Sequence, residues 1–293
     1  MKHIIPFILI LLLLTGCAES APPAKIAATT LPVYEFTCRI AEGTGITVTR
    51  LVTESVSCLH DYSLNVNQVK AAEAAELIVI SGAGLEEFME DILVDRNIVD
   101  ASSGIDLLEC TTEHEHAHDH GHDHDHSHGE DAHIWLSPAN AKLMAQNICD
   151  GLTAQYPQYT EMFRANLDAL MADLDTLQAY GEARLAELSC REVITFHDGF
   201  GYFADTFGLT ILEAVEEESG SEASARELIH LIEVTQEHRL PAIFIEENGS
   251  VSAAGVISRE TGATVYTLSM AMSGDSYFDA MYHNIDTIKE ALE

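Results

Sequence analysis

Short runs rich in β-branched residues alternate with segments of helical spacing along nearly the whole chain, and this alternation restricts the fold more than any other feature. The strand candidates are Ile26–Thr29, Ile46–Val52, Leu77–Ser81, Asn97–Ala101, Val193–Phe196, Thr210–Ala214, Ala242–Glu246 and Thr264–Leu268. The helical candidates are Val33–Ala41, Val66–Glu76, Gly84–Val94, Gly201–Phe207, Ala223–His238, Ala253–Glu260 and Phe278–Leu292. Such alternation produces βαβ units. We therefore predict an α/β fold with two lobes, each built on a mostly parallel sheet flanked by helices.

One long helical pattern separates the two halves. Residues 158–188 contain no Pro and carry apolar residues at helical spacing. As a single helix they would span about 45 Å at ~1.5 Å per residue, enough to run along both lobes. We therefore divide the chain into a first lobe at residues 25–157, a linking helix at 158–188 and a second lobe at 189–293.

The first 24 residues are typical of an exported protein that stays attached to a membrane. Residues 1–16 combine a basic start with the apolar run Ile4–Leu14, which is the pattern of a signal peptide and is too short for a retained spanning helix. Cys17 follows small residues and resembles the lipidated cysteine of bacterial lipoproteins, so residues 17–24 would form a tether. We expect an extracytoplasmic, lipid-anchored protein; the alternative is an ordinary cleaved signal.

The charge balance excludes one class of partner and favours another. The chain has 48 Asp and Glu residues against 14 Lys and Arg residues, a formal net charge of −34. Such a field repels nucleic acids and attracts cations. The five cysteines beyond Cys17 form no CxxC pair, and we interpret most of them as small buried apolar side chains without predicting their disulfide state. They are Cys38, Cys58, Cys110, Cys149 and Cys190.

A low-complexity segment at residues 111–130 holds more than half of the 15 histidines. These residues are His114, His116, His118, His120, His122, His124, His126 and His128. The segment has no apolar face to pack, so we expect a disordered loop. Closely spaced imidazoles favour an auxiliary, weaker metal collector beside the main site. A solvated spacer, a zinc sensor or a partner-binding segment are the alternatives.

Three other histidines occupy the end of a strand or the turn beyond it, where open α/β sheets bind ligands. They are His60 in CLHDYSLN, His133 in DAHIWLSP and His197 in TFHDGFG. Imidazole suits zinc, copper, iron or nickel, and three imidazoles together favour zinc. Each has an aspartate nearby that could accept a hydrogen bond from the second ring nitrogen. These aspartates are Asp61, Asp131 and Asp198.

The motifs resemble the zinc branch of the solute-binding lipoproteins of metal ABC transporters, the ZnuA/AdcA-like proteins. The segments that carry the resemblance are HDYSLN from His60, GAGLEEFM from Gly82, DAHIWLSPANAKLMAQNI from Asp131, TFHDGFGYFADTFGL from Thr195, IFIEEN from Ile243 and TGATVYTLS from Thr261. The resemblance implies a metal site between the lobes, Zn(II) as the transported ligand, a membrane permease as partner, a monomer and no enzymatic activity. It also favours zinc over manganese, because similar manganese proteins have a carboxylate where this chain has His197.

One position departs from the family pattern. Leu268 is followed by Ser269, whereas the family commonly has an Asp that provides a carboxylate ligand. The fourth coordination position then falls to water, Glu246, Asp275 or a histidine of the loop, and we expect water first.

Three other functions remain open. A manganese or iron importer subunit is disfavoured by the third histidine. A His-rich zinc buffer or adhesin without a transport role would need the same binding chemistry. A secreted zinc hydrolase would need a placed general base, and the chain has no HExxH motif.

Overall fold

The computed structural model describes residues 25–54, 59, 62–109, 129–215, 224–247, 249 and 251–293. Several sequence predictions therefore lie outside the described residues. These are the signal peptide and tether, the His-rich segment at 111–128, and the residues Cys17, Cys58, His60, Asp61 and Cys110.

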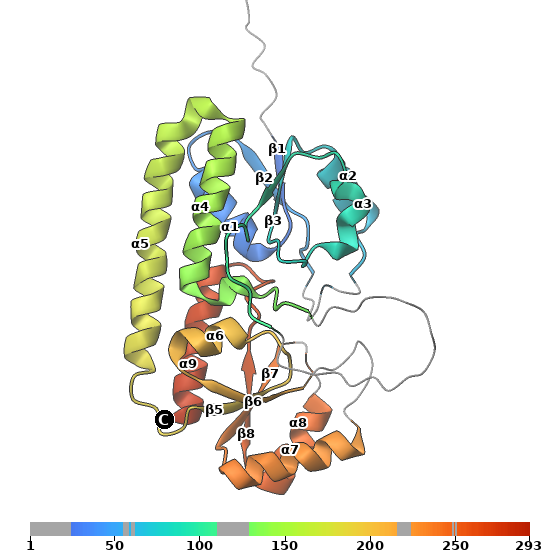
Figure 1. Ribbon diagram of the computed structural model, residues 1–293, viewed down its shortest axis with the longest axis vertical. Coiled ribbons are helices and arrows are strands. Elements are labelled where there is room, and N and C mark those ends of the chain that lie inside the picture. The colour runs from blue at the N-terminus through green and yellow to red at the C-terminus, as the bar shows by residue number, and fades with distance from the viewer. Residues whose placement is uncertain are drawn as a thin grey trace, which may run out of the picture.

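Two sheets of four parallel strands confirm the predicted fold class (Figure 1). The first sheet has the order β2-β1-β3-β4, with β1 (Lys25–Ala28), β2 (Thr47–Arg50), β3 (Leu77–Ile80) and β4 (Ile98–Asp100). The second has the order β6-β5-β7-β8, with β5 (Glu192–Thr195), β6 (Thr210–Ala214), β7 (Ala242–Glu246) and β8 (Thr264–Leu268). Both lobes therefore repeat one topology. In each sheet, the second strand in the sequence lies on one side of the first strand and the third lies on the other side. This reversal creates a switch point in each lobe, where ligands typically bind.

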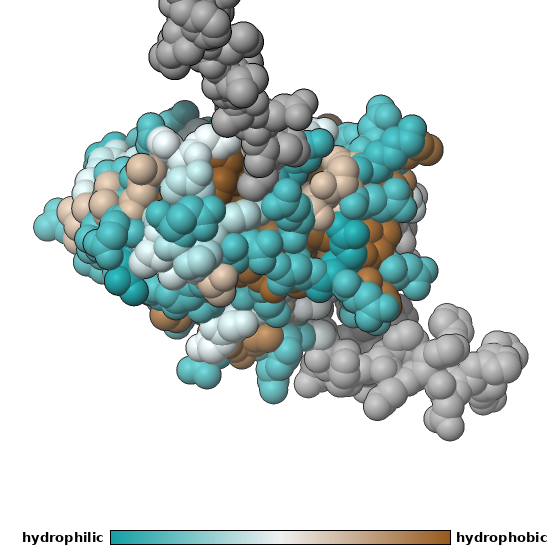
Figure 2. Space-filling view, turned by 90° about the horizontal axis from the view of Figure 1, so that it is seen from above, coloured by the Kyte–Doolittle hydropathy of each residue, from teal (hydrophilic) through white to brown (hydrophobic). Residues whose placement is uncertain are grey.

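The helices flank these sheets and join them. They are α1 (Leu31–Ile40), α2 (Val66–Glu73), η1 (Glu87–Met89), α3 (Glu90–Leu93), η2 (Ile134–Leu136), α4 (Pro138–Gln155), η3 (Pro157–Tyr159), α5 (Thr160–Arg184), α6 (Gly201–Phe207), α7 (Ala225–His238), α8 (Val251–Thr261) and α9 (Tyr277–Leu292). Across the described ranges, none of them combines the length and the apolar character that a membrane span requires. Hydrophilic side chains cover most of the coloured surface in Figure 2.

The predicted helix at Gly84–Val94 is wrong in its first half. Gly82, Ala83 and Gly84 have φ of 82°, 54° and 79°, so the backbone there is left-handed. A right-handed helix cannot begin through such residues. The segment instead forms a turn, the short 3₁₀ helix η1 and the single turn α3.

The linking helix joins the lobes but is shorter than the predicted 158–188. A 3₁₀ turn occupies Pro157–Tyr159, and α5 then runs for 25 residues, about 37 Å at ~1.5 Å per residue, antiparallel to α4 (Figure 1). The guanidinium of Arg191 donates to the carbonyls of Leu185 at 2.8 Å and Ala186 at 2.9 Å. These bonds satisfy carbonyl groups beyond the last helical turn, so the chain can leave the helix there.

The lobes share one apolar core rather than touching only through α5. Trp135 of η2 and Tyr277 of α9 are fully buried in it. The Trp135 indole N–H donates to the Met270 carbonyl at 2.8 Å, and the Tyr277 hydroxyl donates to the Trp135 carbonyl at 2.8 Å. The backbone N–H of Tyr277 also donates to the Glu35 carboxylate of α1 at 2.6 Å. The segment after β8 is thereby fixed against the first lobe.

Glu86 is a buried carboxyl group beneath the switch point of the first sheet. Its Oε1 accepts hydrogen bonds from the Thr29 hydroxyl at 2.6 Å and the Ser81 N–H at 2.7 Å, and its Oε2 accepts one from the Gly82 N–H at 3.0 Å. Burial nevertheless raises the pKa of Glu86 to about 7, because removal from water penalises the carboxylate more than these donors favour it.

This pKa makes the stability of the metal-free protein depend on pH. Because the folded pKa exceeds the ordinary value of 4.5, the folded state takes up a proton as the pH falls through 7. We expect the unfolding free energy of the wild type, relative to Glu86→Gln, to rise by up to about 3 kcal/mol between pH 8 and pH 4.5. Urea unfolding at several pH values measures this difference. The exposed Glu87→Gln serves as the control, and a difference that is flat or falls with acid contradicts the prediction.

Candidate metal centre

His197 and His133 meet at the switch point of the second sheet. His197 lies two residues beyond the end of β5, and Glu246 is the last residue of the neighbouring strand β7. His133 comes from the first lobe, directly before η2. The Thr195 hydroxyl donates to the His197 carbonyl at 3.1 Å and so supports the turn that carries the ring. The site therefore draws one imidazole from each lobe.

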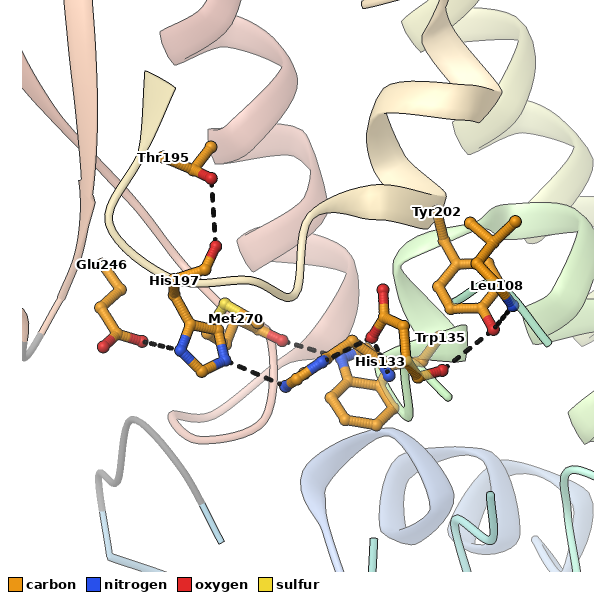
Figure 3. Close-up of polar contacts among 9 residues, drawn as sticks. Leu108, His133, Trp135, Thr195, His197, Tyr202, Glu246 and Met270 are labelled. Atoms are coloured by element: carbon orange, nitrogen blue, oxygen red, sulfur yellow. Dashed lines mark hydrogen bonds and ion pairs between the residues drawn. The ribbon is translucent and has the colours of Figure 1, made fainter. Parts of the chain in front are cut away.

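The two imidazole rings face each other through their Nε2 atoms (Figure 3). The Nε2–Nε2 distance is 3.2 Å and the rings are nearly perpendicular, at 89°. Two imidazole nitrogens bound to one tetrahedral zinc ion would be about 3.3 Å apart, given Zn–N bonds of ~2.0–2.1 Å. Only 12% of the His133 side chain and 11% of the His197 side chain are exposed. The pair thus has the spacing and the burial of two ligands of one metal ion.

A carboxylate lies near the Nδ1 atom of each ring, on the side opposite to Nε2. Asp131 Oδ1 lies 2.8 Å from His133 Nδ1 and also accepts a hydrogen bond from the His133 backbone N–H at 2.9 Å. Glu246 Oε2 lies 4.0 Å from His197 Nδ1. A carboxylate only accepts hydrogen bonds, so a ring bonded to one carries its proton on Nδ1 and presents the Nε2 lone pair.

Tyr202 of α6 holds the segment that leads to His133. Its hydroxyl donates to the Asp131 carbonyl and accepts from the Leu108 N–H, both at 2.9 Å (Figure 3). The Asp131 N–H also donates to the Leu108 carbonyl at 2.7 Å. Sequence reasoning did not single out Tyr202, because its partners are backbone atoms 71 and 94 residues away. A residue of the second lobe therefore positions a site segment of the first.

Gly199 leaves no room for a side chain beside the two histidines. A Cβ atom there would lie 2.8 Å from His133 Nδ1, 2.8 Å from His197 Cδ2 and 2.7 Å from Met270 Cε. The Gly after His197-Asp198 is therefore required by the close approach of the two rings.

The serine that replaces the common family aspartate is part of a turn. Ser269 is buried, and its hydroxyl accepts a hydrogen bond from the Ala271 N–H at 3.2 Å. The Asn284 side chain of α9 accepts a hydrogen bond from the Ser269 N–H at 2.8 Å and donates one to the Ser269 carbonyl at 2.7 Å. Of the other predicted residues, Asp275 is exposed and Asp198 is buried.

Two described residues of the motif that begins at His60, Tyr62 and Asn65, have structural roles. Tyr62 donates to the Glu54 carboxylate at 2.5 Å and accepts from the Gln68 amide at 2.7 Å. Burial raises the pKa of Tyr62 to about 12. Asn65 caps α2 in a capping box with Gln68, which explains why an Asn follows the HDYSL motif. His60 itself is outside the described residues.

Within the described part of the chain, the two histidines do not form a complete metal site. No group of three or more His, Cys, Asp or Glu side chains is placed there to hold an ion. Two of the three predicted histidines are thus brought together, and the third falls where the chain is not described.

Substitution of Gly199 tests this packing. In Gly199→Ala the new methyl group should push the two rings and Met270 apart, which lowers the unfolding free energy by about 1–3 kcal/mol. Gly255→Ala is the matched control, because its Cβ would meet only the Arg259 guanidinium at 3.7 Å, and Ala is the better helix former. Urea unfolding compares the two, and equal stabilities would contradict the tight approach.

The chain is similar over nearly its whole length to zinc-uptake proteins. The family model described as zinc-uptake complex component A, periplasmic, matches residues 26–291. The high-affinity zinc uptake system protein ZnuA of Bacillus subtilis is 31% identical over 94% of this chain and 90% of its own length.

Two solved structures extend the similarity to the fold. A crystal structure of ZnuA superimposes with a TM-score of 0.78, at 27% identity over 92% of this chain and 100% of that one. The Zn(II)-bound ZnuA-like domain of Streptococcus pneumoniae AdcA superimposes with a TM-score of 0.75, at 25% identity over 92% and 99%. With the family match and the paired histidines between two like lobes, these similarities place the chain in the zinc-uptake complex component A (ZnuA) family, whose members are solute-binding proteins and not enzymes.

Proposed function

We propose that this protein captures Zn(II) outside the cytoplasmic membrane and delivers it to the permease of an ABC importer. The observation that carries the proposal is the pair His133 and His197, one from each lobe, with their Nε2 atoms 3.2 Å apart. Imidazole nitrogens at this spacing match zinc, whereas manganese sites are richer in oxygen ligands. We propose His60 as the third ligand, because its motif follows strand β2 in the sequence, and ligands of parallel α/β sheets bind beyond the carboxyl ends of the strands.

Water is the proposed fourth ligand. The Ser269 hydroxyl already accepts a hydrogen bond within its turn, Asp275 is exposed, and Glu246 lies on the Nδ1 side of His197. A water molecule needs no further side chain and leaves one position at which a transporter could compete for the ion.

The metal would bridge the lobes and favour their approach. Because His133 and His197 come from different lobes, an ion bound to both stabilises only arrangements in which the lobes are close. The core around Trp135 and Tyr277 is continuous between the lobes, so we expect small movements rather than a wide opening.

The segments outside the described residues complete the proposal. Residues 1–16 would be removed as a signal peptide, and Cys17 would be lipidated, with 17–24 as the tether. A lipid anchor would keep a monomer with lobes at 25–157 and 189–293 beside its permease. The histidines of 111–128 would act as an auxiliary collector that raises the local zinc concentration.

A competitive titration separates this proposal from its alternatives. The protein should bind one Zn(II) tightly against a chelator of known affinity, and deletion of residues 111–128 should leave this site intact. Manganese in excess should not displace the zinc. Displacement by manganese would favour a manganese or iron importer, and loss of tight binding with residues 111–128 would favour a His-rich zinc buffer.

Alanine substitution tests the ligands directly. His133→Ala and His197→Ala should each weaken zinc binding by more than ~100-fold, beyond the range of an outer-shell residue. His230→Ala is the matched control, because His230 is exposed on α7 and pairs with Glu213 at 2.9 Å. Wild-type affinity in His197→Ala would refute a site shared by the two lobes.

A further inference from the structure

Glu246 lies beside Nδ1 of His197, on the side of the ring away from His133. It ends β7, whose partner strand β5 leads to His197, and the residue is only 6% exposed. Its Oε2 is 4.0 Å from His197 Nδ1, whereas Nε2 of the same ring points to His133 at 3.2 Å (Figure 3). The carboxylate and the proposed ion are therefore on opposite sides of the imidazole.

This placement argues against Glu246 as a ligand. An ion bound at Nε2 lies beyond the far side of the ring, whereas a zinc–carboxylate bond is about 2.0–2.2 Å long. The Glu246 side chain is also enclosed by the turn after β7. A Cβ atom on Gly249 would lie 3.1 Å from its Cγ, and the Gly249 N–H donates to the Glu246 carbonyl at 2.9 Å.

The other histidine shows what such a carboxylate does. Asp131 bonds His133 Nδ1 at 2.8 Å and leaves His133 Nε2 directed at the site. Glu246 occupies the corresponding side of His197, and a shift of about 1 Å would close its contact to a hydrogen bond. The two lobes thus present the same arrangement of carboxylate, imidazole and inward Nε2.

We propose that Glu246 is a positioning residue that holds His197 as the Nδ1–H tautomer and leaves its Nε2 lone pair for zinc. The inference rests on the proposed function, because it assigns a role within that site. Without an acceptor at Nδ1, a neutral imidazole is free to carry its proton on Nε2, where it blocks metal binding.

The first readout is the tautomer itself in the metal-free protein. Nitrogen-15 NMR at a pH where imidazole is neutral, about 8, should show the proton of His197 on Nδ1. Glu246→Ala should shift the proton towards Nε2. Glu246→Gln should largely keep it on Nδ1, because the amide oxygen still accepts a hydrogen bond. Glu247→Ala, exposed at the next position, is the matched control and should change nothing.

The second readout is zinc affinity. Glu246→Ala should weaken binding about 10–100-fold, with rescue to within ~10-fold of the wild type in Glu246→Gln. The visible spectrum of the Co(II)-substituted protein should keep the same band pattern in both variants, because no ligand is lost. If Glu246→Ala does not fold, the tautomer of His197 in the wild-type protein still decides the question, because a proton on Nε2 would overturn the inference.

Two results from the variants would also overturn the inference. One is an unchanged His197 tautomer and affinity in Glu246→Ala; the other is a Co(II) spectrum that reports a lost oxygen ligand. Failure of the proposed function is seen separately, as wild-type zinc affinity in His197→Ala. The tautomer is measured without metal, so it does not depend on which ion the site takes.

Discussion

The buried contact between Trp135 and Tyr277 is the constraint on which the rest of the structure depends. Each side chain hydrogen-bonds a backbone carbonyl, and the Tyr277 ring also packs edge-on against Phe36 at 5.0 Å. Breaking this contact would leave polar groups unsatisfied in an apolar core, which costs about 1–3 kcal/mol for each group. His133 lies two residues before Trp135, so the contact that joins the lobes also fixes one half of the site.

The second lobe builds the other half and reaches back to the first. Tyr202 bonds the backbone at Leu108 and Asp131, and Gly199 allows the His197 ring to approach His133. The second lobe therefore contributes to the position of the first lobe's imidazole. A site of this kind forms only when both lobes are folded and packed, and metal binding at the proposed site would therefore depend on the relative position of the lobes.

The proposed site takes its ligands from nitrogen although the chain is rich in carboxylates. The chain is strongly acidic, with a net charge of −34, yet the carboxylates of Asp131 and Glu246 lie behind the imidazoles rather than between them. Their charge attracts a cation without placing the oxygen ligands that manganese prefers between the two rings. Electrostatic attraction and metal preference can therefore be set by different atoms.

Local patterns in the sequence determined most of the secondary structure, the two parallel sheets and the identity of His133 and His197 as candidate ligands. These follow from apolar periodicity and from the position of a residue relative to a strand end, which are properties of neighbouring residues. Only the tertiary structure decided that Glu246 stands at Nδ1 of His197, that Tyr202 supports Asp131, and that the Ser269 hydroxyl is used in a turn. The prediction of a helix from Gly84 was wrong in its first half, because the spacing of apolar residues does not reveal where the backbone is left-handed. Side-chain direction and contacts between residues far apart in the chain depend on packing, and no local pattern encodes them.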